Sequence, residues 1–196
     1  MAKINPGKLS SKKEVIVQKA ATLFKNKGYT SASMRELAES VGVEAPSLYN
    51  HIGSKGELLQ AICFKIAGAF TGHLEETERA DTGIKEKIES IIRFHIGMML
   101  DDFDEVYVSN HEWKHLKEPQ LSDFLTRRKE YEKKLVLLVE AGIQHGEFKP
   151  TDPYVTVLTI LSAVRGLEFW QQHKRNISTE TLKEDMVNHL LNGIAK

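Results

Sequence analysis

Two histidines four residues apart form the most specific chemical motif in the chain. Residues 111–115 read His-Glu-Trp-Lys-His. On an α-helix the H-E-x-x-H spacing puts both imidazoles on one face, where they chelate zinc and the glutamate serves as a base. The extended motif needs a glycine and a third histidine, and the chain has Glu118 and Leu121 there. We therefore expect no catalytic site and no bound metal; a metal sensor using His111 and His115 and, more remotely, a zinc hydrolase stay open as alternatives.

A second set of polar residues lies on a short predicted helix at 45–51. Ser47, Asn50 and His51 fall on the side of this helix away from its apolar positions. Short side chains that donate and accept hydrogen bonds suit base edges and phosphates in a major groove. Lys55, at the start of the next helix, can reach a phosphate. The pattern favours DNA binding, and the alternative is a helical bundle with a polar surface.

Helices must position these groups, because no stretch of alternating apolar and polar residues bounded by turns predicts a strand. Apolar residues recur at intervals of three and four between glycine and proline breaks. The fold class is all-α, with about nine helices. The expected helices cover 12–27, 34–41, 45–51, 55–78, 84–100, 103–116, 119–145, 153–174 and 179–194.

Local signals near the N-terminus predict a helix-turn-helix. Ser33 and Glu36 have the spacing of a capping box, in which each side chain binds the other residue's backbone amide. Gly42 ends that helix, and Pro46 suits the first turn of the next one. Two short helices around a tight turn form the motif that places its second helix in the major groove.

Composition excludes several classes of protein. The chain has 196 residues, of which 28% are charged, and a single cysteine, Cys63, so neither disorder nor a disulfide framework is expected. The polar start is unlike a secretory signal, and no run of about 18 apolar residues predicts a membrane span, so we expect a cytoplasmic protein. Residues 1–56 hold nine basic and four acidic residues, against 18 and 23 in the remainder. A basic head on an acidic body favours contact with a polyanion at one end.

Residues 12–60 resemble the DNA-binding head of the tetracycline-repressor (TetR) family of bacterial regulators. The motifs that carry the resemblance are Gly28-Tyr29, Ser33-Met34-Arg35-Glu36-Leu37-Ala38, Val41-Gly42-Val43, Leu48-Tyr49-Asn50-His51-Ile52 and Ser54-Lys55-Gly56-Glu57-Leu58-Leu59. Ile52 stands where the family usually has phenylalanine, and Pro46 where it often has glycine.

The resemblance implies a DNA-binding domain at 1–53 and an effector-binding and dimerisation domain at 54–196. Tyr49 and Lys55 would bind phosphates, while other positions face the groove. The DNA-binding residues that it implies are Ser33, Arg35, Ala45, Pro46, Ser47, Tyr49, Asn50, His51 and Lys55.

The last two predicted helices carry more apolar surface than one chain needs. Polar residues of helix 153–174 are confined to a narrow stripe, and helix 179–194 repeats apolar residues by fours. We expect these helices to form a two-fold four-helix interface between two copies of the chain. The TetR resemblance implies the same homodimer; the alternative is that both helices cover the core of one chain.

The middle helices are rich in methionine and aromatic residues, which form cores and also line adaptable ligand cavities. The TetR resemblance implies a small-molecule effector here. A weaker resemblance, through Glu112-Trp113, Arg128, Tyr131, Gly142, Gly146-Glu147-Phe148 and Trp170, is to the TetR branch that controls fatty-acid or steroid breakdown and responds to acyl-coenzyme A esters. The predicted ligand-binding residues are Phe64, Phe94, Met98, Trp113, Arg165 and Trp170, and other candidate polar groups are His95, His111, Arg127 and His173.

These patterns together predict a ligand-responsive transcriptional regulator without enzymatic activity or cofactor. Its partners are operator DNA, a second copy and a small apolar effector, with an acyl-coenzyme A ester as one candidate. We expect a repressor, because a protein that occupies a promoter blocks polymerase without further machinery.

Overall fold

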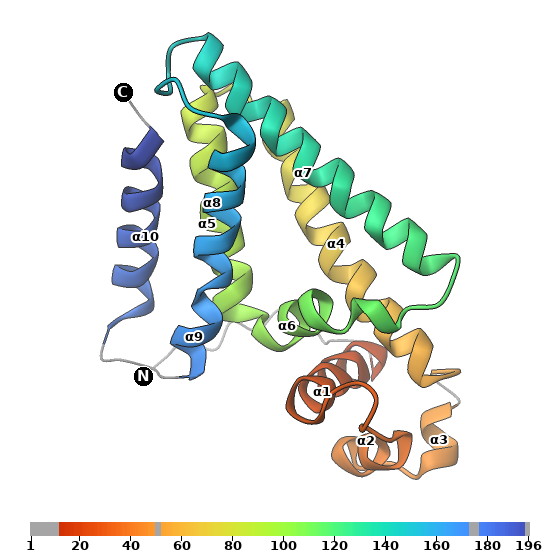
Figure 1. Cartoon of the computed structure of the whole chain (residues 1–196). Helices are drawn as coiled ribbons and strands as arrows, with labels where there is room; N and C mark the ends of the chain where they lie inside the picture. Colours follow the sequence, from red (N-terminus) through yellow and green to blue (C-terminus); the bar gives the residue numbers. More distant parts are fainter. Residues whose placement is uncertain (1–11, 50–51, 173–176, 195–196) are drawn as a thin grey trace.

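A computed structural model describes residues 12–49, 52–172 and 177–194, and the structural statements below concern these residues. Figure 1 shows an assembly of helices around a long diagonal helix, α4. The elements are α1 (Lys12–Lys27), α2 (Met34–Val41), α3 (Ala45–Tyr49), α4 (Lys55–Arg79), α5 (Ile84–Asp101), α6 (Phe103–His111), a 3-10 turn η1 (Trp113–His115), α7 (Gln120–Gln144), α8 (Pro153–Arg165), α9 (Leu167–Gln172) and α10 (Thr179–Ile194).

The all-α prediction is confirmed, and two of the nine expected helices are interrupted. The expected helix 103–116 ends at His111 and continues as the 3-10 turn η1. The expected helix 153–174 breaks at Gly166 into α8 and α9. Each break changes the direction in which the following side chains point, and the first of them affects the histidine motif directly.

The head, α1–α3, is fixed by the local signals read from the sequence. The Ser33 hydroxyl accepts a hydrogen bond from the Glu36 amide at 3.2 Å, and the Glu36 carboxylate accepts one from the Ser33 amide at 3.0 Å. Gly42 has a φ of 75°, which a residue with a side chain rarely adopts, and its amide binds the Glu39 carbonyl. These caps set the tight turn between α2 and α3.

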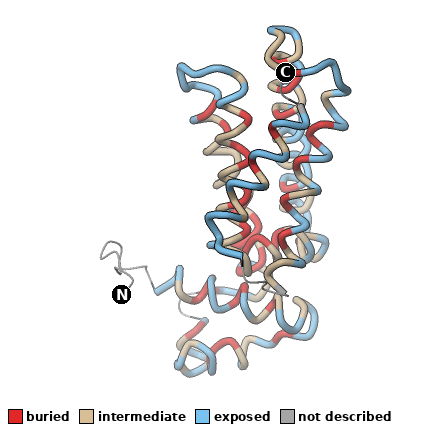
Figure 2. The backbone as a smooth tube through the Cα atoms, turned by 90° about the vertical axis from the view of Figure 1, so that its left-hand side faces the viewer, coloured by how far each residue is buried: buried red, intermediate tan, exposed pale blue. Residues whose placement is uncertain are grey.

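Two hydrophobic cores lie along the molecule (Figure 2). The first core joins α1–α3 to the first half of α4, and it also includes Val108 of α6 and Phe124 of α7. The second core fills the body, which we define as α4–α10, with side chains from α4, α5, α7, α8 and α10. The predicted division at 53/54 falls just before α4, whose Ile62 and Cys63 belong to the head's own core.

The turn after α7 explains the Gly-Glu-Phe motif. Gly146 has a φ of 76°, which reverses the chain. The Glu147 carboxylate then accepts hydrogen bonds from the Lys85 amide at 2.9 Å and the Ile84 amide at 3.4 Å, and so caps α5. Phe148 turns back into the body's core, where its ring lies against Gly142 of α7.

Gly142→Ala should lower the free energy of unfolding by about 1–3 kcal/mol, in spite of the better helix propensity of alanine. A Cβ at Gly142 would lie 2.3 Å from Cδ2 of Phe148, which is buried and cannot withdraw. Gly72→Ala in α4 is the matched control, because its Cβ would meet nothing within 4 Å. We expect that variant to gain about 0.5–1 kcal/mol. Chemical denaturation measures both, and an equal change in the two variants would contradict the packing argument.

Of the helices that the structure describes, none has the length and apolar character needed to span a membrane.

Candidate nucleic-acid interface and ligand cavity

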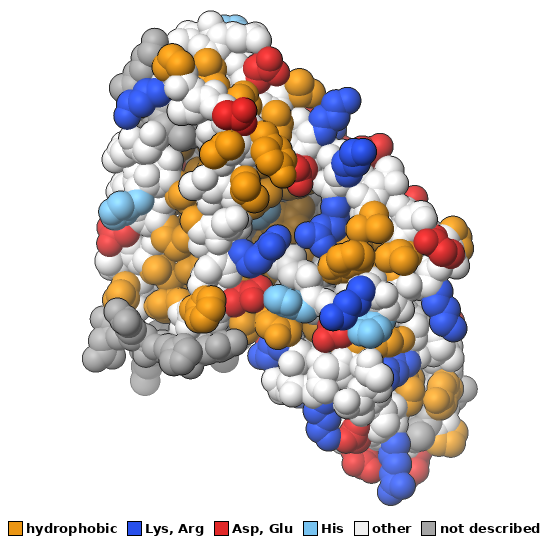
Figure 3. All heavy atoms as spheres, in the orientation of Figure 1, with side chains coloured by type: hydrophobic (Ala, Val, Ile, Leu, Met, Phe, Trp, Pro, Cys, Tyr) orange, Lys and Arg blue, Asp and Glu red, His pale blue; other side chains and the backbone are white. Residues whose placement is uncertain are grey.

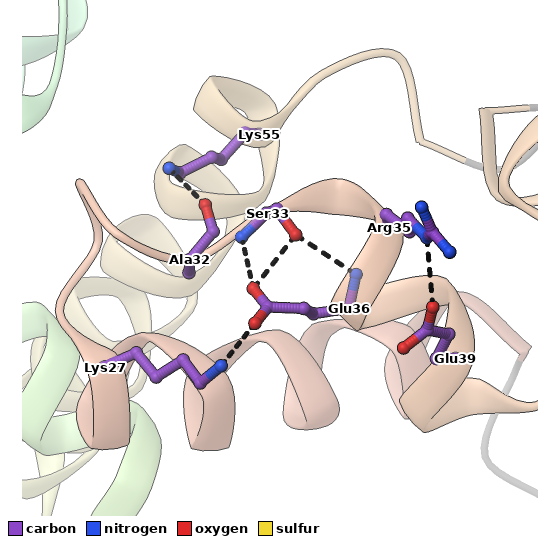
Figure 4. Close-up of polar contacts among 7 residues, drawn as sticks. All are labelled: Lys27, Ala32, Ser33, Arg35, Glu36, Glu39 and Lys55. Carbon is purple, nitrogen blue, oxygen red and sulfur yellow. Dashed lines mark hydrogen bonds and ion pairs between the residues drawn. The ribbon is translucent and has the colours of Figure 1, made fainter.

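The polar network at the start of α2 holds the helix-turn-helix in place (Figure 4). The Glu36 carboxylate binds Ser33 and also pairs with the Lys27 ammonium of α1. The hydrogen bond from Lys27, together with those from Ser33, lowers the pKa of Glu36 to about 2. Arg35, the residue before Glu36, is exposed, and its Nε lies 3.1 Å from the carboxylate of Glu39, one helical turn later. Ser33 therefore caps a helix, and its predicted contact with DNA stays a prediction.

The short helix α3 places two of the predicted DNA-binding residues, Pro46 and Tyr49, at the surface of the head. Leu48 is fully buried, Pro46 is exposed and Ser47 is half-buried. Tyr49 is 51% exposed, so its hydroxyl is available to a phosphate. Ala45 is the first residue of the helix.

Two further predicted contacts, Asn50 and His51, lie outside the described residues. DNA binding by the residues of α2 and α3 stays a prediction. Contact with DNA requires that these side chains lie at the surface of the head.

Lys55 is engaged within the protein rather than projecting freely. Its ammonium donates hydrogen bonds to the carbonyls of Ala32 at 2.6 Å and Thr30 at 3.1 Å, and lies 4.6 Å from the centre of the Tyr29 ring. Partial burial lowers the pKa of Lys55. Lysine has three N–H donors, so one remains for a phosphate. The sequence pattern did not indicate that Lys55 also ties α4 to the loop before α2.

Tyr49→Phe should weaken binding to every DNA sequence by about 3–10-fold, because it removes one hydrogen bond of ordinary strength to the backbone. The dependence of affinity on salt should stay unchanged, because no charge is removed. Fluorescence anisotropy with operator and unrelated duplexes, at several salt concentrations, measures both. Tyr107→Phe is the control, since Tyr107 lies on α6, away from both the predicted DNA-binding residues and the apolar stripe of α8. A loss confined to one sequence would contradict a phosphate contact.

The two histidines of the H-E-x-x-H motif do not share a helix face, which corrects the premise of the zinc alternatives. His111 ends α6, and its Nε2 lies 3.0 Å from the Glu168 carboxylate of α9. His115 lies in η1, where its ring stacks on Tyr29 and its Nε2 is 3.4 Å from Glu112. Because the helix breaks between them, each imidazole has its own partners. Within the described residues, no group of three or more His, Cys, Asp or Glu side chains is arranged to hold a metal ion.

A cavity of about 160 Å³ lies in the body, enclosed by α4, α5, α6, α7 and α8. Its lining combines apolar side chains, among them the buried Met99 and Val106, with polar and charged groups that include the buried His95. Figure 3 shows the hollow on this face, with apolar side chains in it and basic side chains beside it. The lining residues are Ile66, Ala67, Phe70, Thr71, His95, Met99, Val106, Ser109, Asn110, Phe124, Arg127, Arg128, Tyr131, Glu132, Leu161, Val164 and Arg165.

Three arginines of the cavity lining form no ion pair within the described residues, although one carboxylate, that of Glu132, belongs to the same lining and acts on Arg128 from a longer distance. Arg127 and Arg165 are exposed and Arg128 is half-buried, and within the described residues no carboxylate lies at ion-pair distance from any of them. Burial and the nearby charge of Arg165 lower the pKa of Arg128. Unpaired guanidinium groups around an apolar hollow favour the binding of an anion with an apolar part.

Of the six predicted ligand-binding residues, Arg165 lines the cavity and the other five lie elsewhere. Phe64 and Trp113 instead contact two arginines of the lining. The guanidinium carbon of Arg127 lies 5.2 Å from the Phe64 ring centre, and that of Arg128 lies 5.9 Å from the Trp113 ring centre.

The remaining three predicted ligand-binding residues are not part of the cavity lining. Phe94 and Met98 line a different, open groove beside α5. Trp170 packs against the body's core, and its buried indole N–H has no hydrogen-bond partner among the described residues.

Two polar residues that the sequence offered as candidates, His95 and Arg127, do line the cavity, whereas His111 contacts Glu168 outside it and His173 lies outside the described residues. The lining residues Met99, Phe124 and Tyr131 were seen in the sequence as part of the aromatic and methionine content, without a sign of which face they occupy. The methionine and aromatic content of the sequence indicates which helices line the cavity. Which face of each helix lines it depends on how the helices pack.

The last helices expose large apolar side chains on α8 and, at Phe169, on α9. Tyr154, Val155 and Leu158 are each more than half exposed, at spacings that put them on one side of the helix. The apolar repeat of α10 instead packs on the body's core, and the outward positions Glu184, Asp185, Asn188 and His189 are polar. Because Leu182, Met186 and Leu190 of α10 stay half-buried in the single chain, a part for helix 179–194 in the interface between two copies stays a prediction.

In this chain a capped helix-turn-helix is joined by a long helix to a body that contains a cavity. This architecture is that of a DNA-binding transcriptional regulator whose DNA-binding domain and ligand-binding domain belong to one chain. Residues 16–62 match the family model of the bacterial regulatory proteins of the tetR family, and residues 81–194 match that of a tetracyclin-repressor-like C-terminal domain. The chain belongs to the TetR family.

Similar proteins include regulators and solved structures of the same fold. The HTH-type transcriptional repressor KstR2 of Mycolicibacterium smegmatis is 26% identical over 151 residues, which cover 76% of this chain and 74% of that protein. The structure of AibR in complex with isovaleryl coenzyme A and operator DNA is 25% identical, with a TM-score of 0.80 over 92% of this chain and 98% of that chain. The structure of KstR2 of Mycobacterium tuberculosis has a TM-score of 0.88 at 20% identity, over 97% and 98%, and supports the fold.

Proposed function

We propose that this chain is a repressor that binds operator DNA as a homodimer and leaves it when an acyl-coenzyme A ester enters the cavity. The observation that carries the proposal is a cavity whose lining joins apolar side chains to three arginines, Arg127, Arg128 and Arg165, none of which forms an ion pair within the described residues. Acyl-coenzyme A has the matching composition, with phosphates at one end and an acyl chain at the other.

The chemistry of the lining supports this ligand class over a plain hydrocarbon or a cation. Guanidinium groups bind phosphates through two parallel hydrogen bonds, and the half-buried position of Arg128 reduces competition from water. The apolar interior suits a short or branched acyl group. AibR shares the fold and is 25% identical to this chain, and its complex with isovaleryl coenzyme A supports an acyl-coenzyme A ester as the class of effector.

Repression and dimerisation are supported by relatives and by the surface of α8. KstR2 of Mycolicibacterium smegmatis is a repressor, and it resembles this chain over most of its length. The apolar stripe formed by Tyr154, Val155 and Leu158 is suited to meet the same stripe of a second copy. A two-fold pair would present two heads to successive major grooves about 34–36 Å apart. As a regulator of bacterial DNA, the chain would act in the cytoplasm and would catalyse no reaction.

The helix α6 offers a path from the cavity to the head, because it touches both (Figure 1). Val106 and Ser109 of α6 line the cavity. The Asp104 carboxylate, on the same helix, accepts a hydrogen bond from Thr22 of α1 at 2.6 Å and pairs with Lys25. A ligand that displaces α6 therefore moves α1. About 1.4 kcal/mol of differential binding is enough to change DNA occupancy roughly tenfold.

Release of a labelled operator tests the proposal. The operator is first selected by the purified chain from a pool of random duplexes. Fatty acids, acyl-coenzyme A esters of increasing length, free coenzyme A, aromatic drugs and divalent metals are then titrated. We expect release by acyl-coenzyme A esters and by neither free coenzyme A nor metals. Release by metals alone, or by aromatic drugs alone, would overturn the proposed effector class.

A further inference from the structure

A histidine and a tyrosine form a hydrogen-bonded pair in the wall of the cavity. Nε2 of His95 on α5 lies 2.8 Å from the hydroxyl oxygen of Tyr131 on α7. The His95 ring stacks on Phe70 of α4, with ring centres 4.3 Å apart, and the Tyr131 ring also contacts Phe70 at 6.1 Å. All three residues line the cavity. The packing of the His95 and Tyr131 rings on Phe70 therefore fixes a polar pair in the wall of the cavity.

Both members of the pair are uncharged at neutral pH. Burial, with a smaller effect of the nearby His73, lowers the pKa of His95 to about 3, and burial raises the pKa of Tyr131. A carboxylate placed against this pair would lose its water without gaining a cation, because the cavity's arginines are the more exposed groups. The pair therefore suits a neutral polar atom.

One hydrogen bond does not exhaust the Tyr131 hydroxyl, which has one donor and two acceptor sites. If His95 donates, the tyrosine O–H remains free to donate; if Tyr131 donates, its oxygen lone pairs remain free to accept. Within the described part of the chain, His95 is the hydrogen-bond partner of this hydroxyl. In either arrangement the hydroxyl can form a further hydrogen bond, which a hydrocarbon in the cavity cannot provide.

We propose that Tyr131, held in place by His95, binds an uncharged carbonyl or hydroxyl oxygen of the effector, and so selects effectors that carry oxygen on the part that enters the cavity. This inference rests on the proposed function only in that it places the effector in this cavity. Tyr131 is the contacting residue and His95 the positioning residue. A saturated hydrocarbon group of the same shape would be disfavoured because it leaves the hydroxyl unpaired.

The size of the cavity selects the probes for a test. At about 160 Å³, it resembles in volume an engineered apolar cavity of about 150 Å³ that takes up benzene. Cyclohexanone and methylenecyclohexane have nearly the same shape and differ in one position, an oxygen against a CH₂ group. Neither carries an anion, so their binding does not depend on the arginines.

Titration of the full chain with each probe, followed by calorimetry and by methyl NMR shifts, measures the selection. We define the ketone preference as the ratio of the binding constant of cyclohexanone to that of methylenecyclohexane, and we expect Tyr131→Phe to lower this ratio by about 3–10-fold, because only the ketone accepts a hydrogen bond from the hydroxyl. Tyr107→Phe is the matched control, because Tyr107 lies on α6 outside the cavity lining. His95→Leu, which removes the positioning group, should reduce the preference as well and serves as the second variant if Tyr131→Phe does not fold.

A ketone preference that is the same in the unmodified chain and in Tyr131→Phe would overturn the inference, since the hydroxyl would then contribute nothing to binding of the ketone. The failure of both probes to bind would overturn it too. Failure of acyl-coenzyme A esters to release the operator, with the ketone preference intact, would overturn the proposed effector and leave this inference standing.

Discussion

Replacing Arg128 and Arg165 together by methionine should raise the concentration of acyl-coenzyme A needed to release the operator by about a hundredfold or more. Each charged hydrogen bond to a phosphate contributes about 1.5–3 kcal/mol, and methionine keeps the apolar part of the arginine side chain while removing the charge. Affinity for the operator without effector should stay unchanged, because both residues lie in the body. Operator release and calorimetry of the ester measure the two quantities separately.

Arg79→Met is the control for this double variant, because Arg79 is exposed at the end of α4 and away from the cavity lining. The control should release its operator at the same ester concentration as the unmodified chain. An unchanged response of the Arg128/Arg165 variant would show that the phosphates bind elsewhere, and would remove the observation on which the proposed effector rests.

Val155→Asp combined with Leu158→Asp should convert the dimer to a monomer and reduce operator affinity by about 10²–10⁴-fold. Two charges on the α8 stripe would have to be desolvated in the interface without a partner. A monomer also loses the gain that comes from binding two half-sites as one unit. Both positions are more than half exposed in the single chain, so folding should be unaffected. Light scattering and far-UV circular dichroism measure assembly and folding.

The outward face of α10 provides the control for the assembly experiment. Asn188→Asp with His189→Asp changes two exposed positions of that helix, and we expect it to leave the dimer intact. Dissociation by the α10 variant and not by the α8 variant would contradict an interface centred on α8. A monomer for the unmodified chain at micromolar concentration would contradict the homodimer itself.

The head was predictable from sequence because its determinants are local. The capping pair Ser33 and Glu36 and the left-handed Gly42 act within a few residues of their own position, and each appears in the structure where the spacing put it. The engagement of Lys55 was not predictable in the same way. Its carbonyl partners are 23 and 25 residues away in sequence, and only the packing of α4 against the head brings them together.

The cavity was harder to predict because α5 is apolar on two sides. Phe94 and Met98 occupy one side and His95 and Met99 the other, one residue and therefore about 100° apart on the helix. Periodicity identifies both sides as buried or half-buried and does not distinguish the one that faces α7. The break after His111 has a similar origin, because the helix-forming residues of 111–115 gave no local signal for a 3-10 turn.

The shared first core determines where this regulator can be cut and rejoined with another. Leu58, Leu59 and Ile62 of α4 are completely buried against the helices of the head, and Val108 and Phe124 from the body complete the same core. A chimera joined at residue 53 would pair the head of one regulator with core residues chosen for another, and would leave gaps or clashes between them. A junction after Cys63 keeps these α4 side chains with their own head, so that the contacts from α6, η1, Leu116 and α7 are what needs redesign to transplant its DNA specificity onto a different sensor.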